Sequence, residues 1–468
     1  MNLSVKIISI FIFFIITSTI CANIIRVPAD QPGIQKGIDS AIDGDTVVVY
    51  PGTYYENIIF KGKKIVVTSR FYESGDLNFV LSTVIDGSKP YNADSASCVR
   101  IVNREDSTTI LQGFTITGGK GTKWVDEHGA GKYCEGGGIL IALSSPVIRY
   151  NLIINNEAVN TKGVTSAGGG GIRAGDGNPK ILNNVITTNK GRYGTGVVLN
   201  YTGAIVKNNI ITNNSGGQDY GGGALWMNHD GSKPKIIENN TIAGNKTVAV
   251  YVWQGASILR NCILWADSSV SSAQIGAHSG SGPTVTYSNV QGGRTGAGNI
   301  NFNPQFADSS FHLSSASPCI DNGDSSAIYN DIEDLSAPGK VRKPSLGGFR
   351  NDIGAYGGPG AAELPFFSQQ TGIIQHLNED PPKFRLEQSY PNPFNPVTNI
   401  SFGISTRSYV SLKIYDLTGK EIVKIISEEL PEGNYSVQWN AKSFPSGIYF
   451  YCLKAGNYSL TKKLILLK

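Results

Sequence analysis

The stretch "GGGILIALSSPVIRYNLIINN", residues 136–156, decides the fold because its pattern occurs five times along the chain. Later copies read "GGGIRAGDGNPKILNNVITTN" (169–189), "GTGVVLNYTGAIVKNNIITNN" (194–214), "GGGALWMNHDGSKPKIIENNTIAGN" (221–245) and "VAVYVWQGASILRNCILW" (248–265). In four copies, 12 residues separate the start of the first apolar run from an asparagine: Ile139 and Asn151, Ile172 and Asn184, Val197 and Asn209, Ala249 and Asn261. In the remaining copy the separation, Ala224 to Asn240, is 16. A fixed spacing with local insertions is typical of a solenoid.

Each copy contains three short runs rich in Val and Ile, which in the first copy are "ILI", "VIRY" and "LIINN". Strands this short must pair with their equivalents in neighbouring copies, which predicts parallel sheets wound into a coil. Asparagine recurs at one turn because it tolerates left-handed backbone and because stacked amides can form a hydrogen-bonded ladder. We therefore expect a structural role for Asn151, Asn184, Asn209, Asn240 and Asn261, with Asn289 a weaker member.

The composition of the 468-residue chain agrees with a coil of strands. Charged residues make up 16%, against about 25% in an average soluble protein, and 56 residues are glycine. This favours stacked strands and tight turns over charged helices. The net charge of +4 is not concentrated in any tract, so the sequence gives no indication of a nucleic-acid partner.

The first residues, "MNLSVKIISIFIFFIITSTICAN", contain one lysine, a short apolar run and then small residues. This pattern predicts a secretory signal peptide over residues 1–22, and no later segment is apolar enough to span a membrane. Five cysteines remain after cleavage, at wide and irregular spacing. We expect them to be free, buried side chains, with Cys98 and Cys134 the nearest pair if a disulfide forms.

These repeats resemble the right-handed parallel β-helix proteins of the pectate-lyase-like superfamily. The likeness begins at "IRVPADQPGIQKGIDSAIDGDTVVVYPGTYYENI" (25–58), where Ile34, Ile38 and Ile42 have helical spacing and predict a short helix that covers the first coil. The segment "VVVYPGTY" would begin the first strands. The likeness to this superfamily ends with "NPQFADSSFHLSSASPCIDNGD" (303–324) and "NDIGAYGGPG" (351–360), which resemble the closing segment of secreted β-helix proteins. The predicted β-helix covers residues 23–360.

After a linker predicted over residues 361–383, alternating runs divided by turn residues predict a small immunoglobulin-like antiparallel sandwich over residues 384–468. "YPNPFNP" (390–396), "YDLTGKEI" (415–422), "SGIYFYCLKAG" (446–456) and "KKLILLK" (462–468) resemble the type A sorting domain of type IX secretion substrates. A generic immunoglobulin-like module would share this fold but would not explain its position at the end of the chain. The resemblance implies export by the type IX machinery, to the exterior or outer surface of a Gram-negative bacterium.

Four polar loops precede the glycine-rich strands: "GGKGTKWVDEHGAGKYCE" (118–135), "EAVNTKGVTSA" (157–167), "KGRY" (190–193) and "SGGQDY" (215–220). In β-helix relatives this flank borders the polysaccharide groove, so the resemblance implies that the loops meet there. The candidate catalytic residues are Asp126, His128, Glu135, Arg192 and Asp219. The candidate substrate-binding residues are Trp124, Tyr133, Lys190, Tyr193 and Tyr220.

Two chemistries fit these residues. A polysaccharide lyase would use Arg192 or Lys190 as the base, with Ca²⁺ held by Asp126, Glu135 or Asp219. A glycosidase would use two of those three carboxyl groups. The phrase "WVDEH" is only loosely similar to the Trp-x-Asp-His motif of pectate lyases, and the sequence contains no polygalacturonase or pectin-esterase signature. The metal ligands therefore stay undefined.

A second polar cluster, His229 and Asp230, lies in a Gly- and Pro-containing turn that favours a solvated role. The other histidines show no metal-binding pattern. The sequence thus predicts a secreted, monomeric β-helix protein that binds an extracellular polysaccharide and could cleave it. The alternative is a non-catalytic surface or adhesion protein.

Overall fold

The computed structural model describes residues 22–228, 235–255, 257–267, 273–278, 280, 282–366, 374–376, 384–389, 391–430, 432–441 and 444–467. The predicted signal peptide up to residue 21 and the His229 and Asp230 cluster lie outside the described residues. Within the described part of the chain, no helix has the length and apolar character needed to cross a membrane.

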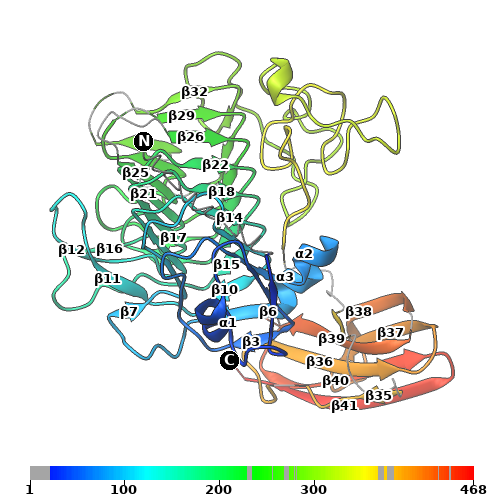
Figure 1. The fold of residues 1–468 in the computed structure, drawn as a ribbon. Helices are drawn as coiled ribbons and strands as arrows, with labels where there is room; N and C mark the ends of the chain where they lie inside the picture. The colour runs from blue at the N-terminus through cyan, green and yellow to red at the C-terminus, as the bar shows by residue number, and fades with distance from the viewer. Residues whose placement is uncertain are drawn as a thin grey trace, which may run out of the picture.

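Three parallel sheets form the predicted coil (Figure 1). Sheet A consists of β1 (Ile24–Val27), β2 (Thr46–Val49), β5 (Val66–Ser69), β9 (Ile110–Gln112), β14 (Val147–Arg149), β18 (Lys180–Leu182), β22 (Ile205–Lys207), β26 (Lys235–Glu238), β29 (Ser257–Arg260) and β32 (Thr284–Thr286). Sheet B consists of β3 (Gly52–Tyr54), β6 (Thr83–Asp86), β10 (Thr115–Thr117), β15 (Leu152–Ile154), β19 (Val185–Thr187), β23 (Ile210–Thr212), β27 (Thr241–Ala243), β30 (Ile263–Trp265) and β33 (Asn289–Val290). Sheet C consists of β4 (Ile58–Ile59), β8 (Val99–Ile101), β13 (Ile139–Ala142), β17 (Ile172–Gly175), β21 (Val197–Asn200), β25 (Leu225–Asn228), β28 (Val250–Val252) and β31 (Ile275–Ala277). The right-handed parallel β-helix is confirmed.

The interior of the coil is filled by alternate residues of these strands. Ile139, Ile172 and Val197 occupy equivalent inward positions of sheet C and belong to one continuous apolar core. Such short strands are stable because each pairs with a strand above and below, and their Val- and Ile-rich inner faces share one core. The next pairings of the column are Val197 with Leu225 and Leu225 with Val250. The predicted alignment through Ala224 and Ala249 is therefore wrong by one residue.

The predicted asparagine ladder is present, but in the last two coils its members lie one residue away from the predicted Asn261 and Asn289. The side-chain oxygen of Asn184 accepts hydrogen bonds from the backbone and side-chain N–H groups of Asn151, and Asn209 and Asn240 continue the series. The next ladder positions are Cys262 and Ser288, since the backbone N–H of Cys262 donates to the Ser288 hydroxyl. Asn261 and Asn289 thus lie beside the ladder, contrary to the prediction.

Tolerance of left-handed backbone does not explain the asparagines at the ladder positions, contrary to the prediction. The left-handed residues of this turn come one position earlier and are Tyr150, Asn183, Asn208, Asn239 and Asn261. The ladder asparagines themselves do not have positive φ angles. Hydrogen bonding between coils, and not backbone conformation, therefore accounts for asparagine at the ladder positions.

A second ladder, which the sequence reading missed, follows sheet B. Asn156, Asn189, Asn214 and Asn245 are linked by the same pair of hydrogen bonds, and Asp267 takes the last position. Each of its four asparagines comes five residues after a member of the first ladder. A fixed offset between two polar residues in successive copies was the available signal.

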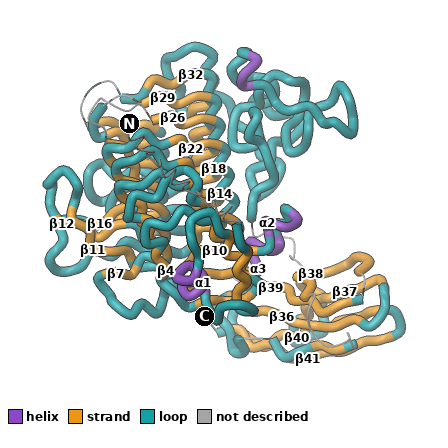
Figure 2. Tube along the Cα trace, viewed as in Figure 1, coloured by secondary structure: helices purple, strands orange, loops and turns teal. Residues whose placement is uncertain are grey.

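Helices are confined to short pieces (Figure 2): α1 (Ile34–Ser40), α2 (Phe71–Ser74), α3 (Asn78–Ser82) and the 3₁₀ turn η1 (Ala327–Tyr329). Helix α1 covers the first coil as predicted, with Ile34 and Ile38 fully buried in the common core. Ile42 lies beyond its end and is exposed. The Glu56 carboxylate accepts the backbone N–H of Ile34 at 2.9 Å, which satisfies a free donor at the start of the helix.

The closing segment is attached to the coil through the left-handed asparagines. Asn183 donates to the carbonyl of Gly360, and Asn208 donates to the carbonyls of Ala355 and Gly357. The donating side chains point outward from successive coils, so the closing segment lies along the coil over several turns (Figure 1).

The C-terminal part forms two antiparallel sheets. One contains β34 (Ile374–His376), β39 (Gly433–Asn440), β36 (Val397–Ile404) and β35 (Arg385–Leu386), and the other β38 (Glu421–Leu430), β37 (Ser408–Tyr415), β40 (Gly447–Ala455) and β41 (Tyr458–Leu466). Ile400, Leu412 and Tyr451 belong to a core of their own. The predicted sandwich is confirmed.

Candidate functional site

The outward residues of sheet C form a column, part of which contributes to the candidate site. Leu140, Arg173, Val198, Trp226 and Tyr251 are paired across five successive strands. Because strand side chains alternate, these positions point away from the coil interior, where Ile172 and Val197 lie. Arg173 and Trp226 would face solvent at these positions unless another segment covered them.

A β-hairpin provides part of that cover. The segment predicted as a polar loop forms β11 (Gly121–Val125) and β12 (Lys132–Glu135), which join β7 (Ser95–Ala96) and β16 (Ala167–Gly168) in a four-stranded sheet. The Asp126 carboxylate stabilises the connecting turn by accepting the backbone N–H groups of His128 and Ala130. The hairpin projects from one side of the coil (Figure 1).

The hairpin is fastened to sheet C by a buried ion cluster. Arg173, with no exposed surface, donates to both carboxylate oxygens of Glu127 at 2.8 and 2.6 Å. Its Nε lies 2.8 Å from Oε2 of Glu135, a residue only 3% exposed. Gly175 makes room for this arrangement, because a Cβ there would lie 2.1 Å from Nη1 of Arg173.

The two glutamates respond differently to this single cation. Burial alone would raise the pKa of Glu127, but the hydrogen bonds and charge of Arg173 outweigh it and hold that pKa below its usual value. Burial raises the pKa of Glu135 despite Arg173 and the Tyr193 hydroxyl, which donates to its Oε1 at 2.6 Å. The interaction with Arg173 therefore outweighs burial at Glu127, whereas burial outweighs it at Glu135.

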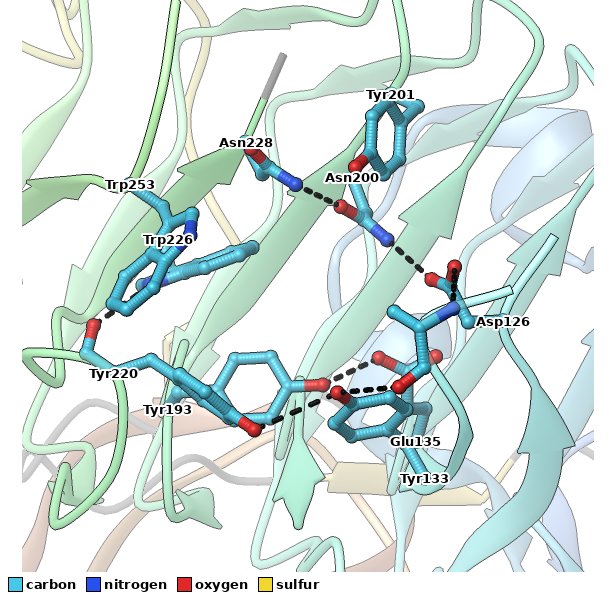
Figure 3. Close-up of a pocket in the computed structure, with 11 residues that line it drawn as sticks. Asp126, Tyr133, Glu135, Tyr193, Asn200, Tyr201, Tyr220, Trp226, Asn228 and Trp253 are labelled. Carbon is cyan, nitrogen blue, oxygen red and sulfur yellow. Dashed lines mark hydrogen bonds between the residues drawn. The ribbon is translucent and has the colours of Figure 1, made fainter. Parts of the chain in front are cut away.

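Beside the hairpin lies a pocket of about 150 Å³ (Figure 3). An engineered protein cavity of about this volume holds one benzene molecule, so the pocket has room for one six-membered ring. Its lining is Asp126, Ala130, Tyr133, Glu135, Tyr193, Asn200, Tyr201, Tyr220, Trp226, Asn228 and Trp253.

One side of the pocket is an aromatic wall, made of Tyr133, Tyr193, Tyr220, Trp226 and Trp253. Tyr220 meets Tyr193 edge to face at 5.3 Å between ring centroids and meets Trp253 edge to face at 5.2 Å. The indole N–H of Trp226 donates to the Tyr220 carbonyl. These contacts hold the rings in place before any ligand binds.

The other side is a row of polar groups (Figure 3). Asn228 donates its amide to Oδ1 of Asn200 at 3.0 Å, and Asn200 donates to Oδ2 of Asp126 at 2.9 Å. Asn200 and Asn228 end the paired strands β21 and β25. The row therefore presents fixed donors and acceptors opposite the aromatic wall.

The pocket collects half of the ten predicted site residues, namely Asp126, Tyr133, Glu135, Tyr193 and Tyr220. His128 lies next to it, stacked on Tyr201 at 3.8 Å between ring centroids and 3.2 Å from Asp176. The Trp124 indole N–H donates to Glu127. These two side chains do not line the pocket.

The remaining three lie on another part of the surface. β20 (Lys190–Gly191) pairs with β24 (Ser215–Gly216), and Lys190 and Arg192 line a separate pocket of about 270 Å³. Arg192 binds the Asp219 carboxylate at 2.6 and 2.7 Å, and Lys190 pairs with Glu157 at 3.0 Å. The hydrogen bonds and charge of Asp219 raise the pKa of Arg192, which opposes a role for this residue as a base.

The sequence reading missed Arg173, Asn200, Tyr201, Trp226, Asn228 and Trp253. The signal for two of them was alternation within "LWMN" (225–228), since Trp226 and Asn228 lie two residues apart on one strand face. Polar or aromatic residues at outward strand positions of successive copies would have indicated a shared surface.

The described residues also bear on the predictions of metal ligands and free cysteines. Across the described ranges, no group of three or more His, Cys, Asp or Glu side chains is placed to hold a metal ion. Cys98, Cys134, Cys262 and Cys319 are free and buried, as expected, whereas Cys452 is free but only half-buried.

Comparison with known proteins identifies the C-terminal part. Residues 388–467 match the family model of the secretion system C-terminal sorting domain. This domain is a type IX secretion signal. The protein is therefore secreted or displayed on the cell surface.

The β-helix has a distant structural neighbour. A pectin methylesterase mutant solved with a hexasaccharide is 10% identical, with a TM-score of 0.28, covering 64% of this chain and 98% of that one. A TM-score this low supports no functional argument, and the fold assignment rests on the strand pairing. No curated protein matches the sequence.

Proposed function

We propose that this protein binds an extracellular polysaccharide and holds one sugar ring in the pocket between the hairpin and sheet C. It would act outside a Gram-negative bacterium after type IX export. The mature β-helix would span residues 23–360 and the sorting domain residues 384–468. The predicted linker 361–383 contributes β34 (Ile374–His376) to the sandwich as an edge strand. The protein would act as a monomer.

The observation that carries this proposal is the pairing of an aromatic wall with a row of amide and carboxylate groups. A sugar ring has an apolar face of C–H groups and a polar edge of hydroxyls. Tyr220 and Trp253 offer flat, partly exposed rings to the first, while Asn200 and Asn228 offer hydrogen bonds to the second. The two sides of the pocket thus match the two kinds of surface that a sugar ring presents.

Cleavage is a second candidate, favoured by one observation. Asp126 and Glu135 both line the pocket, and burial raises the pKa of Glu135, as a general acid of a glycosidase requires. However, both Glu135 oxygens face partners, Tyr193 and Arg173, and both Asp126 oxygens accept hydrogen bonds. Binding is therefore the better supported function. The lyase alternative has less support because Lys190 and Arg192 lie outside the pocket and are paired with carboxylates.

The proposal is tested by affinity electrophoresis of the mature protein against neutral and acidic polysaccharides, followed by calorimetry on those retained. Tyr220→Ala removes a ring from the wall and should weaken binding roughly tenfold, because an aromatic contact contributes about 0.5–1.5 kcal/mol beyond the area it buries and about 1.4 kcal/mol corresponds to a factor of ten. The matched control is Tyr91→Ala, at a fully exposed tyrosine outside the pocket, which should bind as the wild type does.

Failure of the wild type to bind any polysaccharide would contradict the proposal, as would equal affinity of the wild type and Tyr220→Ala. Assays for reducing ends and unsaturated products, with and without Ca²⁺, on the polysaccharide that binds separate the candidates. Turnover would favour the enzyme, and tight binding without products would favour the binding protein.

A further inference from the structure

The charge of the pocket restricts the sugar that it can take. This inference rests on the proposed function and concerns the chemical class of the ligand. Among the described residues that line the pocket, Asp126 and Glu135 are acidic and none is Lys, Arg or His. The remaining polar groups are the amides of Asn200 and Asn228 and the tyrosine hydroxyls.

The cation beneath the pocket is not available to a ligand. Arg173 has no exposed surface, and its guanidinium faces Glu127 and Glu135. One positive charge is thus matched by two carboxyl groups. The nearby cluster adds no positive potential to the pocket and leaves Asp126 uncompensated.

Three other basic side chains near the hairpin face carboxylates, and Lys132 of β12 lies on the opposite strand face from Tyr133 and Glu135. His128 lies 3.2 Å from Asp176, while Arg192 and Lys190 pair with Asp219 and Glu157 around the separate surface pocket. None of them lines the site. Among the described residues that line the pocket, a carboxylate on a bound sugar would therefore meet like charge and no basic side chain.

We propose that the pocket selects an uncharged sugar residue and discriminates against uronic acids. A hydroxymethyl group at C6 can donate a hydrogen bond to a carboxylate such as Asp126, whereas a C6 carboxylate cannot donate and is repelled. Desolvation of an unpaired carboxylate in a small, partly apolar pocket adds to this penalty. The aromatic wall accepts the apolar ring face of either sugar, so the discrimination arises from charge.

The test uses oligosaccharide pairs of matched linkage that differ only at C6, such as β-1,4-manno-oligosaccharide with β-1,4-oligomannuronate and cello-oligosaccharide with β-1,4-oligoglucuronate. Calorimetry with the mature wild-type protein should show the uncharged member binding at least tenfold more tightly than its uronate partner. Methyl esterification of the same oligouronate removes the ligand charge and should recover most of the lost affinity.

A protein variant adds a second measurement. Asp126→Asn keeps the size of the side chain and removes one pocket charge, so the preference for the uncharged member should narrow. The ligand-side comparison of free acid and methyl ester keeps the inference testable if this variant does not fold.

The outcomes separate the two proposals. Tighter binding of the uronate, or no gain on esterification, would overturn the inference while leaving polysaccharide binding intact. No binding to any member of the panel would overturn the proposed function and this inference together.

Discussion

Arg173 lies on the outer face of the coil, yet it is fully buried because the hairpin covers it. Its two glutamate partners come from the hairpin, so the ion cluster ties the hairpin to sheet C, together with the hydrogen bond from Asn200 to Asp126. Buried ion pairs add little net stability compared with apolar packing, but removing one partner leaves an uncompensated charge. The cluster therefore fixes position more than it adds stability, and the pocket wall formed by Tyr133 and Glu135 depends on it.

Arg173→Met should destabilise the β-helix by about 3–5 kcal/mol, since Glu127 and Glu135 lose their cation. Chemical denaturation measures this loss, and limited proteolysis between β11 and β12 should become faster as the hairpin detaches. The control is Arg149→Met, because Arg149 also points outward from a coil strand but binds a neutral partner, Gln112. That change should cost about 1 kcal/mol. An equal loss in both variants would contradict the role assigned to the cluster.

Gly175→Ala tests the same cluster from the other side. An added methyl group would lie 2.1 Å from the Arg173 guanidinium, which would have to move away from Glu127. Because the φ angle of Gly175 is not positive, the effect is steric and not one of backbone strain. We expect weaker glycan binding, measured by calorimetry, and a lower unfolding temperature. Gly447→Ala, where the nearest contact is 3.9 Å, should leave both unchanged, and an unchanged Gly175→Ala protein would show that the space is not needed.

The two asparagine ladders, which begin at Asn151 and Asn156, set the register between neighbouring coils. In the ladder along sheet B, each asparagine accepts on Oδ1 and donates through Nδ2 to a carbonyl of the preceding coil, as Asn245 does to Ile211. Asp267 accepts from Asn245 on Oδ1, while its Oδ2 has no hydrogen-bond partner among the described residues. This oxygen lies on the side where asparagine carries its amide. Burial accordingly raises the pKa of Asp267 to about 7.

Asp267→Asn should stabilise the protein at pH 8 and change little at pH 4. The pKa of Asp267 is raised from 3.8 to about 7, so the folded state binds the proton more tightly and stability falls as the pH rises between these values. The gain at pH 8 is at most about 4 kcal/mol. Unfolding temperatures at the two pH values measure it, with Asp43→Asn at an exposed carboxylate as the control. A gain of equal size at both pH values would exclude the proton as its cause.

The sequence predicted this architecture well and its details less well, for physical reasons. Repeated spacing revealed the coil and the first ladder because inward and ladder positions accept few residue types. Cys262 and Ser288 replace asparagine at that ladder, so alignment on the visible asparagines shifted the last copies by one residue. Charges and tyrosines in the loops located half of the pocket. Arg173 and Trp226 were missed because a single outward side chain in a strand looks like any other surface residue until the coils are stacked.

At the scale of the whole molecule, the chain joins a rigid coil to a sorting domain that matches over residues 388–467. All residues that line the pocket lie between 126 and 253, in the hairpin or on and beside β21, β25 and β28, three successive strands of sheet C. A site built on paired strands is held more precisely than one built on long loops. The sorting domain accounts for where the protein acts, and the outer face of sheet C carries the pocket that we propose binds a sugar.

A crystal structure of the mature protein with an oligosaccharide that it binds tests most directly whether the pocket between the hairpin and sheet C holds a sugar ring. We predict one ring stacked on Tyr220 or Trp253, with its hydroxyls hydrogen-bonded to Asn200, Asn228 or Asp126. A sugar bound elsewhere, such as at the surface pocket of Lys190 and Arg192, with this pocket left empty, would contradict it.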